Sequence, residues 1–457
     1  MTDTVYDMVI LGAGSGGYAA ALRGAQLGLR VALIEADKIG GTCLHRGCVP
    51  TKAILHSAET AEAVREAAAV GVRAAYQGLD MPAVQRYKNG VISRMYKGLQ
   101  GLVASRGIEV VGGWGRLVAR DTVEVSGRRY RGRNIVLATG SLSKTMGQEI
   151  SGPVMTSDQA LELDHVPASA VVLGGGVIGV ELASAWASMG SQVTIIEALP
   201  HLVPNEDEAI SKQLERAFRK RRIAFRTSTM FESVERTAAG VTVRTADGRT
   251  HDAEVLLIAV GRGPATANLG YEEVGVAMDR GFVLTDDYGR TNVEGVWAVG
   301  DIVPGVQLAH RGFAQGITVA EKIAGLDPRP VDDALVPKVT FCEPEIASVG
   351  LSEARAAELH GAQNVTTSEF NVAGNAKSQI LGTQGFVKLV SLKDGPIVGF
   401  HAIGARMGEQ VGEGQLIVSW EADAHDVASL VHAHPTQNET IGEAAMVLAG
   451  KPLHNHG

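Results

Sequence analysis

The amino-acid sequence predicts an α/β fold that contains two Rossmann-like units. The main observation is a run of strand, glycine-rich turn, helix and second strand near the N-terminus, because the same run recurs in the same register later in the chain. Composition agrees with a large folded protein, since 45% of the 457 residues are hydrophobic, 20% are charged and 56 are glycines. A chain of this length is expected to form about two to four domains.

Charge and hydropathy exclude several classes of protein. The net charge is -8 and no long basic run is present, so neither nucleic acid nor an acidic membrane surface is expected as a partner. No apolar run reaches the roughly 18 residues that a membrane span requires. The first residues, MTDTVYDMVILGAG, include acidic side chains and run at once into a predicted strand, which leaves no room for a signal or transit peptide. We therefore expect a cytoplasmic protein.

The first Rossmann-like unit begins with a short predicted strand over residues 7–11. The strand runs into GAGSGG, where Gly12, Gly14 and Gly17 form the G-x-G-x-x-G pattern, and a helix-prone segment and a second strand follow as far as Glu35. In such units the first glycine permits the tight turn, the second lets a pyrophosphate approach the backbone, and the third lets helix and strand pack closely. The pyrophosphate then lies at the helix N-terminus, and the acidic residue accepts from the adenosine ribose hydroxyls.

The second unit repeats this arrangement. SAVVLGGGVIGVELASAWASMGSQVTIIEA places Gly174, Gly176 and Gly179 after one strand and Glu197 at the end of the next. Two such units in the same register predict that the chain binds two adenine dinucleotides on two related domains. No arginine follows Glu197 closely enough to pair with a 2'-phosphate, which favours NAD over NADP in this unit.

Three further predicted strands end in small residues. They are NIVLATGS over residues 134–141, VLLIAVGRGP over residues 255–264, and GVWAVGDIVPG, in which the strand runs into Asp301. A carboxylate at a glycine turn after a buried strand is well placed to accept from a ligand hydroxyl. An aspartate at this position can equally cap the next helix, and both interpretations stay open from the local sequence.

The stretch GGTCLHRGCVPTK, residues 40–52, holds two of the three cysteines. A disulfide that closes so small a loop would contribute roughly 2 kcal/mol, which is minor beside the core of a chain this size. Zinc binding by Cys43 and Cys48 lacks a second cysteine pair or a histidine set with zinc spacing. A redox pair fits better, because a cysteine near a helix N-terminus has a stabilised thiolate, and the charges of Lys52 and Arg46 act in the same direction.

Together these motifs resemble those of the flavoprotein disulfide reductases, over essentially the full length of the chain. GGTCLxxGCxPxK, the two glycine units, ATGS, AVGR, AVGD and a C-terminal HAHPTxxE appear in the order of that family. Within the family, the chain is most similar to the members that oxidise dihydrolipoamide. The resemblance implies an FAD-binding domain at residues 1–147, an NAD-binding domain at 148–267, a central domain at 268–335 that completes the FAD site, and an α+β dimerisation domain at 336–457.

The same resemblance assigns roles to the cysteines and to two charged residues. Cys48 would face the flavin and form the charge-transfer thiolate, and Cys43 would exchange with the sulfur of the substrate. Lys52 would pair with Glu181 beside the flavin ring. From the sequence alone, Glu181 has a second explanation, because the helix dipole favours a glutamate in the first turns of a helix.

Near the C-terminus, SLVHAHPTQNETIGEAAM offers a histidine and a glutamate five residues apart. His434 and Glu439 could form a hydrogen-bonded pair, in which the imidazole accepts a thiol proton near neutral pH. Taken alone, such a pair is more often a surface helix cap. The resemblance to HPTxxE assigns His434 as the base and Glu439 as its orienting partner, both directed at the disulfide of the other subunit of a homodimer.

The resemblance also implies the cofactor sites, the reaction and the partners. The residues assigned to FAD are Gly12, Gly14, Gly17, Glu35, Gly41, Thr42, Thr139, Gly140, Ser141 and Asp301, and those assigned to NAD are Gly174, Gly176, Gly179, Glu197 and Gly261. No metal site is expected. The implied reaction is oxidation of protein-bound dihydrolipoamide by NAD+, through FAD and the Cys43–Cys48 pair. The implied partners are a second copy of the chain and the lipoyl domain of an acyltransferase or a glycine-cleavage H protein.

Two alternative functions are weighed against this one. A mercuric-reductase-like or glutathione-type enzyme is disfavoured, because the C-terminal LAGKPLHNHG has no further cysteine pair and Val177 stands where glutathione-type reductases usually carry tyrosine. A nucleotide-binding scaffold without turnover is disfavoured, because the residues that the resemblance assigns to catalysis are all present.

Several positions depart from the family pattern. His45 and Arg46 replace the more usual Asn-Val pair, and we hypothesise that the charge of Arg46 beside Cys48 shifts the redox potential of the disulfide. Ala265 and Gln315 replace the usual asparagine and glutamate.

Three features have no assigned role in the predicted reaction. The segment NVAGNAKSQILG matches the family poorly and carries no assignment. His432 lies in the HAHPTxxE motif but receives no role, unlike His434. Cys342 has no neighbouring cysteine and is expected to be a buried core thiol.

Overall fold

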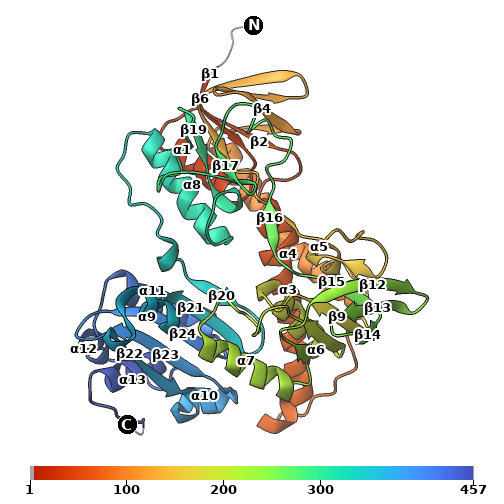
Figure 1. Cartoon of the computed structure of the whole chain (residues 1–457), viewed down its shortest axis with the longest axis vertical. Coiled ribbons are helices and arrows are strands. Elements are labelled where there is room, and N and C mark those ends of the chain that lie inside the picture. The colour runs from red at the N-terminus through yellow and green to blue at the C-terminus, as the bar shows by residue number, and fades with distance from the viewer. Residues whose placement is uncertain (1–4, 456–457) are drawn as a thin grey trace.

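The computed structural model describes residues 5–455, so residues 1–4, which hold part of the acidic N-terminal stretch, and residues 456–457 lie outside the described residues. It has an upper lobe built around a largely parallel sheet and a lower lobe that holds two five-stranded sheets (Figure 1). We call these sheets, with their helices, the first unit, the second unit and the C-terminal unit, in chain order.

The first unit has a sheet in the order β3-β2-β1-β6-β5-β4, and β19 also pairs with β6. Its strands are β1 (Val5–Leu11), β2 (Val31–Glu35), β3 (Glu109–Gly112), β4 (Gly115–Ala119), β5 (Thr122–Val125), β6 (Arg128–Leu137) and β19 (Val296–Ala298). The pairs of β1, β2, β3, β6 and β19 are parallel, whereas β4, β5 and β6 form an antiparallel edge. Helices α1 (Ser15–Gln26) and α8 (Ala309–Ile323) pack against each other beside the sheet (Figure 1).

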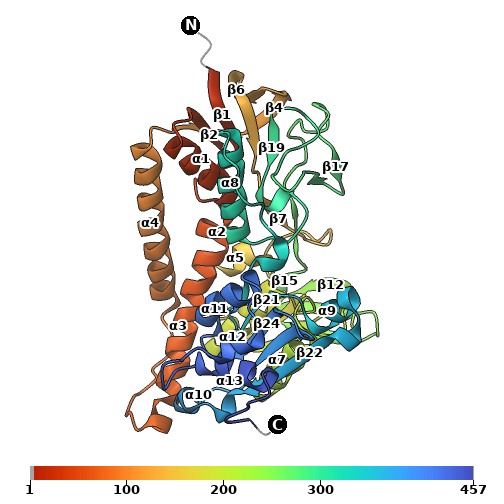
Figure 2. The same ribbon diagram turned by 90° about the vertical axis from the view of Figure 1, so that its left-hand side faces the viewer.

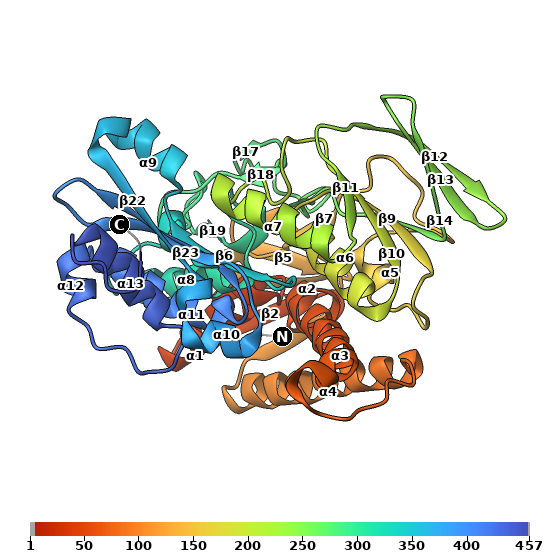
Figure 3. The same ribbon diagram turned by 90° about the horizontal axis from the view of Figure 1, so that it is seen from below.

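The second unit has a parallel sheet in the order β11-β10-β9-β15-β8. Its elements are β8 (Val154–Met155), α5 (Ser157–Ala160), β9 (Ser169–Leu173), α6 (Val177–Met189), β10 (Gln192–Ile196), α7 (Glu208–Lys220), β11 (Ala224–Arg226) and β15 (Val255–Ile258). An antiparallel sheet of β12 (Phe231–Thr237), β13 (Gly240–Thr245) and β14 (Thr250–Ala253) projects at one side (Figure 3). The short strands β7 (Ser141–Ser143) and β16 (Arg262–Pro264) pair where the chain passes between the first two units.

Two long helices run along one side of the molecule from the upper lobe to the lower one (Figure 2). They are α3 (Cys48–Glu66), which follows the short α2 (Gly41–Arg46), and α4 (Met81–Ser105). Helix α4 begins after Asp80, whose side chain accepts from the N–H of Ala83 at 3.0 Å. Helix α3 packs against both α4 and α6, so the helix that begins at a cysteine of the first unit also contacts the second unit.

The C-terminal unit is an antiparallel sheet in the order β20-β21-β24-β23-β22 with helices around it. Its strands are β20 (Lys338–Thr340), β21 (Glu345–Gly350), β22 (Val365–Asn371), β23 (Phe386–Leu392) and β24 (Ile397–Gly404). Its helices are α9 (Glu353–His360), α10 (Ala376–Leu381), α11 (Met407–Ser419), α12 (Ala424–Ala428) and α13 (Glu439–Leu448). The small hairpin β17 (Met278–Asp279) and β18 (Phe282–Val283) lies earlier, before β19.

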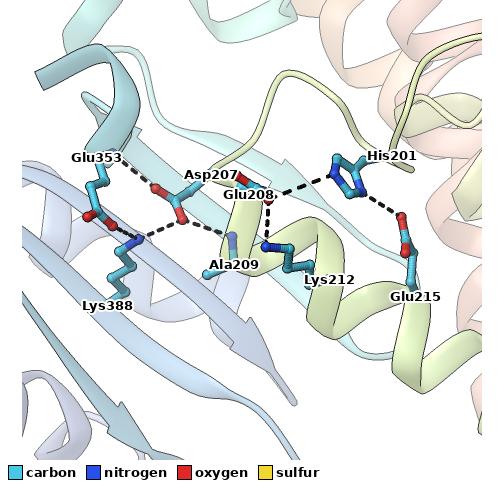
Figure 4. A network of polar contacts seen from close by, with 8 residues as sticks. All are labelled: His201, Asp207, Glu208, Ala209, Lys212, Glu215, Glu353 and Lys388. Carbon is cyan, nitrogen blue, oxygen red and sulfur yellow. Dashed lines mark hydrogen bonds and ion pairs between the residues drawn. The ribbon is translucent and has the colours of Figure 1, made fainter. Parts of the chain in front are cut away.

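A network of charged side chains joins the second unit to the C-terminal unit (Figure 4). On β23, Lys388 Nζ lies 2.8 Å from Asp207 Oδ1 and 2.7 Å from Glu353 Oε2. Lys388 and Asp207 are only 6% and 3% exposed, so they form a buried ion pair. Burial raises the pKa of Asp207, but hydrogen bonds from Lys388 and from the N–H of Glu353 outweigh it and leave the pKa below its usual value.

The predicted fold class is confirmed, with two Rossmann-like units and an α+β C-terminal unit. The strands β1, β2 and β9 are buried over most of their length, as expected for parallel sheets that are covered on both faces. Among residues 5–455, no helix is long and apolar enough to cross a membrane.

Candidate functional site

The first glycine of each nucleotide motif lies in a turn that other residues could adopt only with strain. Gly12 has a φ of 101° and Gly174 a φ of 100°, in the left-handed region that favours glycine. A Cβ atom on Gly12 would overlap the carbonyl oxygen of Ala138, and one on Gly174 would overlap that of Ala259. Each turn therefore needs glycine for its backbone angles and for its contact with the neighbouring strand.

The remaining motif glycines separate into two kinds. A Cβ atom at Gly17 or Gly179 would overlap the carbonyl oxygen of the first glycine of the same motif, so these residues let the helix pack closely on the turn. A Cβ atom at Gly14 or Gly176 would meet no protein atom within 4 Å. Both are helix N-caps without a side-chain hydrogen bond, so the first N–H groups of α1 and α6 stay open. Open N–H groups beside open space fit a pyrophosphate.

Glu35 and Glu197 occupy equivalent places at the ends of β2 and β10. Glu35 accepts from the N–H of Ala13 at 2.7 Å and from that of Asp37 at 2.9 Å. Glu197 accepts from the N–H groups of Gly175 and Leu199, at 2.6 and 2.7 Å. These bonds fix each carboxylate beside its glycine turn, and each oxygen keeps a lone pair for a ribose hydroxyl. Glu197 is buried and Glu35 is half-buried in the described chain.

Asp301 lies in a short turn after β19 and does not cap a helix with its side chain. Its Oδ2 accepts from Ser141 Oγ at 2.5 Å, and Arg262 Nε donates to the same hydroxyl at 2.7 Å. Ser141 begins β7, Arg262 begins β16, and Asp301 follows β19. The contact therefore joins the β7–β16 strand pair to the first unit. Gln315, one of the family departures, accepts from the N–H of Gly300 at 2.9 Å and so holds the turn that carries Asp301.

The other residues assigned to cofactors lie in the same turns. Gly140 and Gly261 have φ angles of 74° and 105°, each just beyond the end of a strand. Thr139 Oγ1 lies 3.1 Å from the hydroxyl of the buried Tyr271. Thr42 lies in the first turn of α2.

The cysteine stretch lies directly against the first glycine turn. The N–H of Gly40 donates to the carbonyl of Ala13 at 2.8 Å, and a Cβ atom on Gly41 would lie 2.7 Å from the Cα atom of Gly14. Cys43 belongs to α2, and Cys48 is the first residue of α3. The fold therefore brings both cysteines to the nucleotide turn of the first unit.

The two cysteines differ in acidity because they hydrogen-bond to each other. The hydrogen bond from Cys43 lowers the pKa of Cys48 to about 7; partial burial opposes this change, and the charge of Lys52 adds to it. The same hydrogen bond, burial and the charge of Cys48 raise the pKa of Cys43. At neutral pH the arrangement favours a thiolate on Cys48 and a thiol on Cys43.

Lys52 and Glu181 make the contact that the resemblance implied. Lys52 Nζ lies 3.0 and 2.8 Å from the two carboxylate oxygens of Glu181, which is 2% exposed. The N–H of Phe341 also donates to Glu181 at 2.9 Å, and Lys52 Nζ lies 4.6 Å from the centre of the Phe341 ring. The ion pair is therefore built from α3, α6 and the segment after β20. The next residue, Cys342, is 1% exposed, which confirms its prediction as a core thiol.

His45 and Arg46 bind elsewhere than at the cysteines. Arg46 Nη1 lies 2.8 Å from Asp37 Oδ2, and both side chains are about half exposed. His45 Nε2 donates to the carbonyl of Ile39 at 2.9 Å, and its ring packs edge-on against Tyr96. The charges that act most strongly on the pKa of Cys48 are those of Lys52 and Glu181, and Arg46 is not among them. The charge of Arg46 is directed at Asp37, and its effect on the redox potential of the disulfide stays a prediction.

His434 and Glu439 form the hydrogen-bonded pair that the motif predicted. His434 Nδ1 lies 2.8 Å from Glu439 Oε1, and Glu439 Oε2 accepts from the N–H of Thr436 at 2.8 Å. The side chain of His434 is 72% exposed. Within residues 5–455, no hydrogen bond joins this pair to either cysteine, because the pair lies in the C-terminal unit and the cysteines in the first.

Two residues near the histidine turn had no assignment from the sequence. Asn375, in the poorly matching segment, caps α10 and donates to the carbonyl of Thr436 at 2.9 Å. Glu413 on α11 lies 2.7 Å from His432 Nε2 and accepts from Asn438 at 2.7 Å. No local signal could have found these residues, because their partners are 19 to 61 positions away in the chain. In the part of the chain that the structure describes, no group of three or more possible metal ligands comes together.

Family comparisons cover nearly the whole chain. The family model described as "Pyridine nucleotide-disulphide oxidoreductase" matches residues 6–316, and the one described as "Pyridine nucleotide-disulphide oxidoreductase, dimerisation domain" matches residues 336–445. A protein named dihydrolipoyl dehydrogenase from Bacillus subtilis is 37% identical over 99% of both chains. The dihydrolipoyl dehydrogenase of Geobacillus stearothermophilus is 36% identical over 98% of this chain and 97% of its own length. The mitochondrial dihydrolipoyl dehydrogenase 1 of Arabidopsis thaliana is 36% identical over 98% of this chain and 91% of its own length.

Solved structures show the same architecture. LpdA from Mycobacterium tuberculosis superimposes with a TM-score of 0.90 at 26% identity, covering 96% of this chain and 99% of its own. The HOCl-induced flavoprotein disulfide reductase RclA from Escherichia coli gives a TM-score of 0.87 at 27% identity, covering 97% and 100%.

Proposed function

Because the chain belongs to the pyridine nucleotide-disulphide oxidoreductase family, we propose that it is an NAD-dependent dihydrolipoyl dehydrogenase that works through FAD and the Cys43–Cys48 pair. The observation that carries this proposal is the cysteine pair itself. It lies against a nucleotide turn, and its hydrogen bond assigns the thiolate to Cys48 and the proton to Cys43. Full-length similarity to dihydrolipoyl dehydrogenases supports the choice of substrate.

FAD would be held by the first unit and NAD by the second. The glycine turn at Gly14 and the carboxylates of Glu35 and Asp301 fit FAD, and the turn at Gly176 with Glu197 fits NAD. When bound, the flavin takes an electron pair from the dithiol and passes a hydride to NAD+. The chain supplies the geometry, the thiolate and the proton acceptor.

The substrate step is a thiol–disulfide exchange in which atoms and electrons balance. In the oxidised enzyme Cys43 and Cys48 form a disulfide. A substrate thiolate attacks Cys43 Sγ, the Cys43–Cys48 bond breaks, and Cys48 leaves as the thiolate. The second substrate thiol then attacks the substrate sulfur of the mixed disulfide and releases Cys43. The substrate dithiol becomes a disulfide, and the enzyme disulfide becomes a dithiol.

His434 would take the thiol proton, with Glu439 fixing the ring. Because Nδ1 faces the Glu439 carboxylate, Nε2 is the nitrogen left to accept a proton. His434 is exposed, and among the described residues no hydrogen bond joins it to the cysteines of its own chain, so in a homodimer we place His434 of one subunit beside the cysteines of the other. The match to the dimerisation-domain family supports the homodimer.

We also propose a lipoyl-domain partner and a cytoplasmic location. A lipoyl domain, on an acyltransferase or on a glycine-cleavage H protein, would deliver the dithiol to the cysteines. A cytoplasmic location fits the small number of cysteines, because the 457 residues hold only three and offer no disulfide framework.

A steady-state comparison tests the proposed function. We expect the purified protein to be yellow and to reduce NAD+ with dihydrolipoamide far faster than it reduces glutathione disulfide with NADPH. Adding a dithiol should produce long-wavelength charge-transfer absorbance, which should disappear in Cys48→Ser. A colourless protein, or a clear preference for glutathione disulfide, would exclude this function.

A further inference from the structure

Glu413, on α11, binds residues on both sides of the turn that carries His434. Its Oε1 lies 2.7 Å from His432 Nε2, and its Oε2 accepts from Asn438 Nδ2 at 2.7 Å. His432 is two residues before His434, and Asn438 directly precedes Glu439. One carboxylate from a different helix therefore spans the turn, with a separate oxygen for each end.

His432 is fixed on two sides. Its Nε2 donates to Glu413, and its side chain is 12% exposed. A Cβ atom on Gly442 would lie 2.7 Å from His432 Nδ1, so the ring rests directly on the backbone of α13. The absence of a side chain at Gly442 lets α13 approach the ring, and Glu413 on α11 holds the ring from the opposite end.

Asn438 fixes the start of α13 to α11 through its side-chain amide. It stands at the N-cap of α13 with helical backbone angles, φ -60° and ψ -25°, and its side chain makes no capping hydrogen bond. The amide nitrogen of Asn438 donates to Glu413 on α11. The start of α13 is therefore tied to α11 rather than capped, and the first residue after this tie is Glu439.

The charges around His432 act in the same direction as its hydrogen bond. The hydrogen bond to Glu413 raises the pKa of His432, and the charge of Glu439 raises it further. Glu413 is the carboxylate that binds His432 directly, whereas Glu439 binds His434. Without Glu413, the charge of Glu439 is the one that still favours the protonated form of His432.

We infer that Glu413 is a positioning residue for the His434–Glu439 pair: it holds both ends of the turn and occupies His432, so that Glu439 serves His434 alone. The inference rests on the proposed function, because it assumes that His434 accepts the substrate proton. Glu413 touches neither cysteine within the described residues, and its effect passes through the turn.

The experiment compares Glu413→Ala and Glu413→Gln in the full-length dimeric holoenzyme. We expect the alanine variant to lose about tenfold or more in kcat for dihydrolipoamide oxidation, because small displacements of a catalytic group are costly. NADH-dependent reduction of ferricyanide, which needs no thiol proton acceptor, should stay within about twofold. The glutamine variant should recover most of the lost rate, since its amide can accept from His432 and donate to a rotated Asn438. Glu409→Ala, an exposed residue on the same helix, is the matched control and should match the unaltered chain.

A double variant separates positioning from general destabilisation. If Glu413 acts through His434, adding Glu413→Ala to His434→Gln should cause no further loss of dihydrolipoamide oxidation. Equal losses in both backgrounds would overturn the inference, as would a Glu413→Ala enzyme with unchanged kcat. If that variant fails to fold, Asn438→Ala provides the same test, because it releases one end of the turn. An unaltered enzyme that reduces ferricyanide but does not oxidise dihydrolipoamide would refute the proposed function instead.

Discussion

Cys43 and Cys48 are chemically identical side chains that their positions make different. Cys48 begins α3 and lies near Lys52, whereas Cys43 is one helix earlier and donates a hydrogen bond to Cys48. The sequence could predict the pair and its redox use, because spacing and flanking residues carry that information. The spacing could not show that the guanidinium of Arg46 binds Asp37, and the effect of Arg46 on the thiolate stays a prediction.

The first prediction concerns the side chains of Lys52, which lowers the pKa of Cys48, and of Arg46, which binds Asp37. The Cys48 pKa of about 7 means that the thiolate fraction, and with it the charge-transfer absorbance of dithiol-reduced enzyme, increases as pH rises through that value. Lys52→Met removes a charge that lowers this pKa, so the absorbance should appear at higher pH, by on the order of one pH unit. Arg46→Met is the matched control and should leave the midpoint unchanged. A spectrophotometric pH titration of the three proteins decides the matter, and equal midpoints for Lys52→Met and the unaltered chain would contradict the assignment.

The nucleotide turns show how a local element can be predicted in detail. Gly174 needs glycine for its φ of 100° and for its contact with Ala259, whereas Gly176 needs it only for what lies beyond the helix N-terminus. The G-x-G-x-x-G spacing contains both requirements, because turn, helix and strand are contiguous in the chain. The two kinds of glycine should therefore respond differently to the same substitution.

The second prediction uses that difference in the second unit. Gly176→Ala meets no protein atom, so the fold, the FAD content and the thermal stability should be preserved. The added methyl group should nevertheless raise KM for NAD+ by about tenfold or more, which corresponds to about 1.4 kcal/mol of lost binding. Gly174→Ala should instead destabilise the protein, because its Cβ overlaps a carbonyl oxygen and its φ is strained. Steady-state kinetics and thermal unfolding separate the two; an unchanged KM in Gly176→Ala would mean that NAD binds elsewhere.

Elements that are held from a distance could not be predicted in this way. The turn at His434 was found from its motif, but the residues that hold it, Glu413 and Asn375, belong to α11 and to the segment before α10. Phe341 likewise joins the Lys52–Glu181 pair from the C-terminal unit. Such contacts depend on how the sheets pack together, and the spacing of residues along the chain carries no record of that packing.

At the scale of the whole molecule, the second and C-terminal units are joined by buried charges rather than by a flexible linker. Lys388 on β23 reaches Asp207 at the start of α7, and Glu353 on α9 completes the contact (Figure 4). Removal of one member leaves a buried, unpaired charge, which costs more than the loss of an exposed ion pair.

The third prediction concerns this junction. Lys388→Met should lower the free energy of unfolding by about 3–5 kcal/mol, because Asp207 would stay buried without its cation. Lys393→Met, an exposed lysine shortly beyond β23, is the control and should change stability by less than about 0.5 kcal/mol. Denaturant unfolding of both variants measures the difference. A change in Lys388→Met no larger than that of the control would show that the junction contributes little.

The pH dependence of this contribution has a definite sign. The folded-state pKa of Asp207 is lowered, so its stabilisation is present above the unfolded value of about 3.9 and is lost as pH falls through the folded value. The gap in unfolding free energy between the unaltered chain and Lys388→Met should therefore narrow in acid. A gap that stays constant down to strongly acidic pH would place the loss in packing rather than in charge.

The carboxylates of Glu35 and Glu197 show how closely the two nucleotide units match. Each carboxylate accepts from the N–H of the residue that follows the first glycine of its turn. Each also accepts from the N–H of the residue two positions after the glutamate itself. The two units therefore hold their carboxylates by the same pair of backbone donors, although 162 residues separate them in the chain. After Glu35 the chain continues into the cysteine helix, and after Glu197 it continues into ALPHLVPNED without a cysteine. The same carboxylate clamp thus serves two different continuations of the chain, and only the one after Glu35 brings sulfur to a nucleotide turn.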